Sequence, residues 1–175
     1  DQSKKICIEN NIPTPKWFVV DNKSIMKEKN FKGKVVVKPI NEGSSVGMSI
    51  VSNCLNEDRE TSLELKNAFD HCFSVSSCAM VEEYISGREL TVSILNNKSL
   101  PIIEILPSGD FYDYKCKYTK GESEYIVPAI IDSEIEKLLV EYSLKIHKII
   151  GCGGYSRVDF RLCDDNKIYF LEINT

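Results

Sequence analysis

Residues 155–174 read YSRVDFRLCDDNKIYFLEIN, two runs rich in β-branched and aromatic residues on either side of a polar segment. This pattern predicts a β-hairpin with strands at 155–162 and 167–174. We expect Cys163 to pair with Ile168 at the turn. Because side chains alternate along a strand, each strand presents one apolar and one polar face. The hairpin is therefore expected to cover a core with one side and to expose polar groups on the other.

The polar face of this hairpin carries two acidic side chains. The predicted register places Asp159 opposite Glu172. It also places Arg157 opposite Asn174. Like charges directly opposite each other destabilise a sheet, so something positive should offset them. Carboxylate and amide oxygens are ligands that Mg²⁺ prefers. We interpret Asp159, Glu172 and Asn174 as metal ligands; the alternative is a solvated outer face, on which acidic residues are common.

A glycine- and serine-rich loop follows a lysine at the end of a β-branched run. Lys38 ends the run at 35–38, Pro39 follows it, and the loop occupies 41–47. Its backbone N–H groups and hydroxyls can surround phosphate oxygens. The loop lacks the spacing of a Walker loop, and an ordinary polar hairpin loop is the alternative interpretation.

Residues 81–89, VEEYISGRE, join the end of a predicted strand to a turn that carries acids and a tyrosine. Backbone groups in such a connector can hydrogen-bond an adenine edge, and a carboxylate can hold ribose hydroxyls. The alternative is that these glutamates are simply solvated.

Residues 107–124 form a polar stretch too long for an ordinary loop, which favours a functional one. Three tyrosines and two lysines lie within 108–118. This composition suits a lid that closes over a charged substrate and excludes water. A packed Ω-loop with surface lysines is the alternative.

The overall pattern predicts an α+β fold. Strands come in hairpins rather than in regular βαβ units, which argues against a doubly wound sheet. Helical spacing is found at 3–10, 57–72 and 132–151. The strands expected outside the terminal hairpin are 16–20, 35–38, 48–51, 79–85, 89–95 and 100–106.

The composition is that of a globular protein. Of 175 residues, 42% are hydrophobic and 27% are charged, which excludes a disordered chain. The net charge is −4, with no basic stripe of the kind that nucleic-acid binders show. No run approaches the ~18 apolar residues that span a bilayer. We therefore expect no nucleic-acid partner and no membrane partner.

The cysteines and histidines suggest no metal or nucleophile of their own. Seven cysteines are scattered without a C-x-x-C pair, so neither a zinc site nor a disulfide framework is expected. Reduced thiols and the lack of an apolar leader favour a cytoplasmic location. A Cys–His dyad would need His71 or His147, which both lie in helical stretches and are interpreted as surface or core residues.

Together, five motifs resemble the ATP-grasp superfamily, and within it the D-alanine–D-alanine ligase family. The resemblance covers nearly the whole chain, and its strength lies in the order of the motifs. They are Lys38-Pro39 with 42–48, Glu82 with Ile85-Ser86-Gly87 and Glu89, Phe111-Tyr112-Asp113-Tyr114 with Lys117-Tyr118, 154–159, and 171–175.

The resemblance implies two α+β lobes that sandwich the nucleotide. The small central lobe would span 1–81, and a truncated large lobe would span 82–175. The family's N-terminal domain and C-terminal end lie outside this chain, so we expect the isolated chain to be inactive. The family also suggests a homodimer.

The resemblance also implies roles for individual residues. Glu82, Glu83 and Ile85 would face adenine. The nucleotide-binding set is Lys38, Glu42, Ser44, Ser45, Glu82, Glu83, Ile85, Glu89, Phe111 and Lys117. The catalytic set is Arg157, Ser45 and Tyr118, with Tyr118 closing the lid. Two Mg²⁺ or Mn²⁺ ions would be bound by Asp159, Glu172 and Asn174.

The implied reaction joins two molecules of D-alanine. The carboxylate of one attacks the γ-phosphate of ATP, giving an acyl phosphate and ADP; the amine of the other then displaces phosphate. The product would be the D-Ala-D-Ala dipeptide of peptidoglycan synthesis. Positioning and charge neutralisation would supply most of the catalysis. The alternatives are another ATP-grasp carboxylate–amine ligase, including one that uses D-lactate or D-serine, and a non-catalytic nucleotide-binding module.

Overall fold

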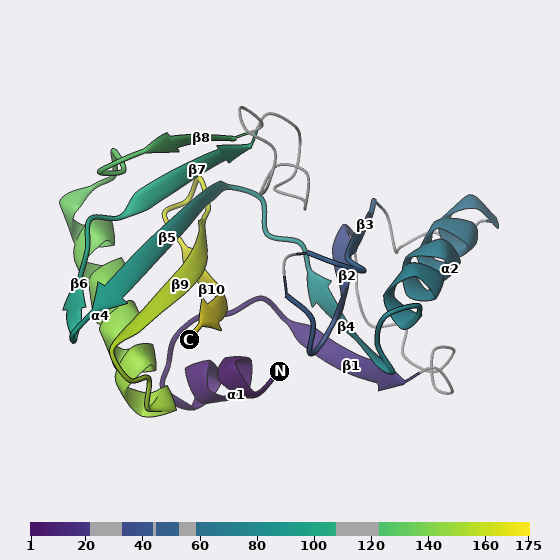
Figure 1. Ribbon diagram of the computed structural model, residues 1–175. Helices are drawn as coiled ribbons and strands as arrows, with labels where there is room; N and C mark the ends of the chain where they lie inside the picture. The colour runs from purple at the N-terminus through teal and green to yellow at the C-terminus, as the bar shows by residue number, and fades with distance from the viewer. Residues whose placement is uncertain (22–32, 44, 53–58, 108–122) are drawn as a thin grey trace. The chain divides into compact units, whose positions relative to one another are not determined.

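The computed structural model shows an α+β protein, as predicted (Figure 1). The residues that the structure describes are 1–21, 33–43, 45–52, 59–107 and 123–175.

The chain divides into two compact units, and each has its own sheet and core. Unit 1 comprises Asp1 and Pro15–Tyr84, and unit 2 comprises Gln2–Thr14 and Ile85–Thr175. The assignment of the two halves to ATP-grasp lobes stays a prediction. The division by contacts differs from the predicted one in giving the N-terminal helix to unit 2.

Unit 1 consists of an antiparallel sheet with a helix packed on it. The strand order is β1-β4-β2-β3, and α2 packs against β2, β3 and β4 (Figure 1). The elements are β1 (Trp17–Asp21), β2 (Val35–Pro39), β3 (Ser49–Val51), α2 (Arg59–Phe73) and β4 (Cys78–Glu83).

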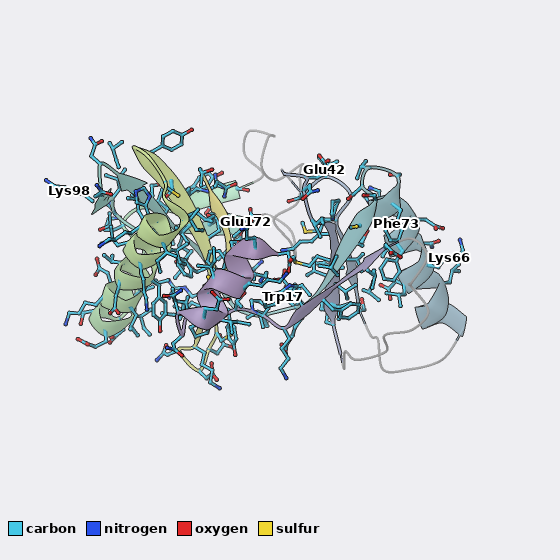
Figure 2. All side chains as sticks on the ribbon, turned by 90° about the horizontal axis from the view of Figure 1, so that it is seen from below. Trp17, Glu42, Lys66, Phe73, Lys98 and Glu172 are labelled. Carbon is cyan, nitrogen blue, oxygen red and sulfur yellow. The ribbon has the colours of Figure 1, made fainter. Side chains whose placement is uncertain are left out.

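The core of unit 1 follows from the alternation in β2 and the helical spacing in α2. Val35 and Val37 are completely buried and lie on the same face of the sheet. Ala68 and Phe69 of α2 belong to the same core. The opposite side of α2 carries the exposed Lys66 (Figure 2). The other face of the sheet carries Lys38 of β2 and Glu82 of β4 next to the buried Val36 and Met80.

In its described residues, unit 2 consists of a second antiparallel sheet with two helices. The strand order is β10-β9-β5-β7-β8, and β6 pairs with β5. The helices are α1 (Gln2–Glu9) and α4 (Ser133–Ile150). The strands are β5 (Arg88–Leu95), β6 (Lys98–Ser99), β7 (Ile103–Pro107), β8 (Ser123–Ile126), β9 (Tyr155–Leu162) and β10 (Ile168–Asn174).

Helix α4 closes the core of unit 2, and its ends are capped. The Asp132 side chain accepts a hydrogen bond from the Glu134 backbone N–H at the first turn. Gly151 follows the helix with a left-handed φ of 77°. Ile135, Leu139 and other apolar residues of α4 pack with the apolar face of β5, β9 and β10. Within the described ranges, no helix is both long and apolar enough to cross a bilayer.

Sequence reasoning located the helices better than the minor strands. The strand expected at 100–106 begins only at Ile103, because Pro101 has no N–H to donate to a ladder. The short strand β6 was missed. The polar strand β8 was also missed, because it begins within the stretch 107–124 that was interpreted as a loop. The structure pairs its backbone with β7.

Gly87 lies where the turn before β5 touches β9. Its φ is +138°, and a Cβ atom there would overlap the backbone carbonyl oxygen of Leu162. We predict that Gly87→Ala lowers the free energy of unfolding by about 2–4 kcal/mol, because backbone strain and steric overlap add. The matched control is Gly153→Ala, where a Cβ meets nothing within 4 Å and the change should stay within about 0.5 kcal/mol. Urea unfolding measures both; equal losses would contradict the close packing at Gly87.

The thiol of Cys7 is completely buried in the core of unit 2. Burial raises the pKa of this thiol from 9.0 to about 12. The positive charge of Lys4 lowers the same pKa by a smaller amount. Above pH 9 the Cys7 thiol therefore loses its proton more readily in the unfolded chain than in the folded chain. The thiol's contribution to stability is complete below pH 9 and is lost as the pH rises towards the folded pKa.

We predict that the difference in unfolding free energy between the native chain and Cys7→Ala shrinks above pH 9, by at most about 1.4 kcal/mol per pH unit. Urea unfolding of both proteins between pH 7 and pH 10.5 measures the difference. A difference that is independent of pH would contradict the role of the buried thiol.

Candidate functional site

A β-bulge in β10 decides which of its side chains face the core of unit 2. Phe170 pairs with Phe160, but Glu172 pairs with Asp159, so Leu171 is an extra residue on β10. The alternation of side chains changes phase at this point. Phe170 and Ile173 consequently both pack against the core. Glu172 is exposed on the opposite face, which it shares with its register partner Asp159.

The bulge also corrects one of the sequence-based predictions. The expected pairing of Cys163 with Ile168 was wrong, because Ile168 pairs with Leu162. The one-residue shift restores the predicted register beyond the bulge, where Arg157 pairs with Asn174. The predicted opposition of the two acids is therefore confirmed although the pairing assumed at the turn was not.

Asp159 is the buried centre of this polar face. Only 8% of the residue is exposed, and its carboxylate accepts hydrogen bonds from three residues. Oδ1 accepts from Thr91 Oγ1 at 2.6 Å and from Arg157 Nε at 3.0 Å. Oδ2 accepts from Arg157 Nη2 at 2.9 Å and from Asn174 Nδ2 at 3.2 Å. A buried carboxylate is tolerated only when it is paired and hydrogen-bonded in this way.

The guanidinium of Arg157 supplies the positive charge that the two opposed acids require. It binds Asp159 through two nitrogens, which is the strong, geometrically specific form of an arginine–carboxylate pair. About half of the Arg157 side chain is exposed. The guanidinium is thus oriented by Asp159 and still accessible to an anionic group.

The oxygen-bearing side chains on this face fit a hard divalent cation. Asp159, Glu172 and Asn174 lie on the same face at neighbouring register positions, and Mg²⁺ is commonly bound by one or two carboxylates plus substrate phosphates. No group of three or more His, Cys, Asp or Glu side chains among the described residues is arranged for a metal. The metal site therefore stays a prediction, with two carboxylates and one amide as its donors.

Glu89, the residue expected to hold ribose, lies on the same face two residues from Thr91. Its carboxylate is 2.9 Å from Arg161 Nη2, and both side chains are only 12% exposed. Arg161 Nη1 also donates to the Gly87 carbonyl at 3.0 Å. The register pairs Glu89 with Arg161 and Thr91 with Asp159. The predicted ribose and metal residues of unit 2 therefore share one face of one sheet.

Unit 1 carries the predicted phosphate-binding lysine in a separate ion pair. Lys38 Nζ is 2.6 Å from Glu82 Oε2, with 22% of the lysine side chain and 3% of the glutamate side chain exposed. Both side chains lie on the sheet face opposite Val35 and Val37, since Glu82 pairs with Val36. The buried glutamate holds the ammonium in place at the end of β2.

The connector after β4 has two of its backbone donors already in use. The Glu83 N–H donates to the Lys16 carbonyl at 2.9 Å, and the Tyr84 N–H donates to the Lys34 carbonyl at 3.0 Å. The Lys34 ammonium lies 4.2 Å from the centre of the Tyr84 ring. The predicted contacts of Glu83 and Ile85 with adenine stay predictions.

The remaining predicted residues are only partly described. Glu42 is exposed in the loop after β2 (Figure 2), and Ser45 has a φ of 60° next to the turn at Gly47. The predicted roles of both stay predictions. Four further predicted residues lie outside the described ranges: Ser44, Phe111, Lys117 and Tyr118.

Sequence reasoning missed Thr91 and Arg161. A threonine and an arginine in a strand are readily explained by β propensity and by solvent exposure. The available signal was their phase: Thr91 shares the phase of Glu89, and Arg161 shares the phase of Asp159.

Comparisons with known proteins give one consistent result. A family model described as "D-ala D-ala ligase C-terminus" matches residues 6–175. The chain is 42% identical to the D-alanine–D-alanine ligase of Aquifex aeolicus over 177 residues, covering 100% of this chain and 57% of that protein.

Two solved structures show the same similarity. A D-alanine–D-alanine ligase from Bacillus anthracis complexed with ATP has a TM-score of 0.73 at 30% identity, over 99% of this chain and 53% of that one. The VanG D-Ala:D-Ser ligase from Enterococcus faecalis has a TM-score of 0.81 at 32% identity, over 100% of this chain and 51% of that one. The chain thus spans about half the length of the relatives it matches.

Asp159→Asn keeps the size of the side chain but removes the charge that Arg157 binds. We predict at least ~10-fold weaker binding of Mn²⁺ in the presence of ATP, because a metal ligand and its orientation are both lost. Electron paramagnetic resonance of free Mn²⁺ measures the affinity. The matched control is Asp165→Asn, which changes an exposed carboxylate paired with Lys167 at 2.8 Å in the same hairpin. Native affinity in Asp159→Asn would contradict the predicted metal site.

Proposed function

The chain belongs to the D-alanine–D-alanine ligase family, and on this basis we propose that it carries the ATP and metal site of an enzyme that makes D-Ala-D-Ala. The two units would act as ATP-grasp lobes around the nucleotide. The substrates would be ATP and two molecules of D-alanine, and the product would enter peptidoglycan synthesis. The homodimer suggested by the family stays a prediction.

The observation that carries this proposal is the opposition of Asp159 and Glu172 on the polar face of unit 2. Neither residue serves the core, whereas their neighbours on the same strands do. Asp159, Glu172 and Asn174 would hold one or two divalent cations. Such cations would neutralise the negative charge that develops on the phosphate oxygens during transfer.

Arg157 would act on the group in transfer. Its guanidinium is fixed by the bond to Asp159 and is about half exposed, so it can donate to a phosphoryl oxygen without reorganising. In unit 1, Lys38 would donate to ATP phosphates from the orientation that Glu82 imposes. Glu89 would accept hydrogen bonds from ribose hydroxyls while Arg161 holds its carboxylate.

These residues bring the reactants together rather than forming bonds with them. The carboxylate of the first D-alanine would attack the γ-phosphorus of ATP, and ADP would leave. The amine of the second D-alanine would then attack the acyl carbon, and inorganic phosphate would leave. Charge neutralisation and alignment are the main contributions that a protein makes to such a transfer.

A ligase with a different second substrate is the other candidate. The similarity to a D-Ala:D-Ser ligase structure is as extensive as that to the D-alanine–D-alanine ligase structures. Tyr118, which the family resemblance implies closes the lid, lies outside the described residues. The choice between D-alanine, D-serine and D-lactate therefore requires a direct comparison.

The first experiment measures binding and ADP release by the 175-residue chain. We predict Mg²⁺-dependent binding of ATP without sustained, D-alanine-dependent release of ADP, because the chain spans about half the length of its relatives. Isothermal titration and a coupled ADP assay measure the two quantities. Absence of ATP binding would contradict the proposed function, and ligase turnover by the chain alone would contradict the expected inactivity.

The second-substrate comparison uses a form of the protein as long as its relatives. ADP release is expected to be fastest with D-alanine as the second substrate. Faster release with D-serine or D-lactate would replace the proposed product with the corresponding one.

A further inference from the structure

Thr91 lies directly beside the predicted metal ligand Asp159. We propose that Thr91 is a positioning residue, whose hydroxyl fixes Oδ1 of Asp159 so that the carboxylate is held ready for a divalent cation. This inference rests on the proposed function and assigns a role to a residue of β5 that the family motifs do not include.

Thr91 donates this hydrogen bond from β5, the strand next to the β9–β10 hairpin that carries the predicted metal ligands. Thr91 is the register partner of Asp159 across β5 and β9. Thr91 Oγ1 is 2.6 Å from Asp159 Oδ1, and the two residues are 4% and 8% exposed. An ionised carboxylate can only accept, so the threonine hydroxyl is the donor. Because the acceptor is charged and buried, this is a charge-assisted hydrogen bond, which is stronger than one between neutral groups.

Thr91 differs from the other donors to Asp159 in its burial. Arg157 and Asn174 are exposed residues; together they occupy Oδ2, and Arg157 Nε also donates to Oδ1 beside Thr91. A carboxylate offers about four acceptor positions in all. A cation that binds Oδ2 must therefore replace one of the exposed donors, whereas the bond from Thr91 to Oδ1 can remain.

The consequence is a division of tasks between the two oxygens. Oδ1 accepts from the buried hydroxyl of Thr91 and from Arg157 Nε, whereas both close donors to Oδ2 belong to exposed residues that can exchange. Partners that orient a metal ligand typically contribute 10–100-fold to metal affinity. Removal of the Thr91 hydroxyl should therefore weaken the affinity for the metal, although Thr91 is not itself a proposed metal ligand.

The test compares Mn²⁺ affinity in three variants of the 175-residue chain, with a non-hydrolysable ATP analogue present. Thr91→Val keeps the shape of the side chain but removes the donor, and we predict at least ~10-fold weaker binding of Mn²⁺. Thr91→Ser restores the donor and should bind within ~3-fold of the native chain, since the serine hydroxyl can donate in the same way. Ser93→Ala is the matched control, because Ser93 lies on the same face of β5 but pairs with Arg157.

The possible outcomes distinguish failure of the role of Thr91 from failure of the proposed function. Native affinity in Thr91→Val, or equal weakening in Thr91→Ser, would overturn the role of Thr91 and leave the proposed function intact. Failure of the native chain to bind Mn²⁺ with the nucleotide would contradict the proposed function and this inference together. Should Thr91→Val not fold, as judged by circular dichroism, Thr91→Ala takes its place with the same expected loss.

Discussion

The bulge at Leu171 is the feature on which the candidate site of unit 2 depends. A regular strand would place Phe170 and Glu172 on the same face, so either an aromatic ring would be exposed or a carboxylate would be buried in an apolar core. One extra residue removes this conflict, since Phe170 and Ile173 pack inward and Glu172 points to the polar face. The apolar core and the acidic pair are thus built from the same seven residues of β10.

Three of the buried or partly buried acids among the described residues are each matched by a cation from their own unit. Asp159 is bound by Arg157 in unit 2, Glu82 is bound by Lys38 in unit 1, and Glu89 has an arginine partner in the same way. Burial without such partners would be costly. The pairs also hold charged groups in defined orientations before any ligand arrives, which is the condition for strong electrostatic stabilisation of a transferring group.

Much of this arrangement could be predicted from the sequence, and the remainder could not for physical reasons. Alternation and composition gave the α+β class, the terminal hairpin and the opposed acids. The predicted pairing of Cys163 at the turn was wrong, because strict alternation of side chains does not allow for the extra residue of a bulge. The phase change between Phe170 and Ile173 was present in the sequence and would have located the bulge. Thr91 was missed because a threonine in a strand needs no explanation beyond β propensity.

We propose that Asp159 and Glu172 converge on one divalent-cation site. Crystals grown with Mn²⁺ and an ATP analogue test it through the anomalous scattering of the metal. We expect an anomalous peak about 2.0–2.3 Å from oxygens of Asp159 and Glu172, with nucleotide phosphate completing the coordination. A peak bound elsewhere, with the Arg157–Asp159 pair intact and Glu172 turned to solvent, would contradict it.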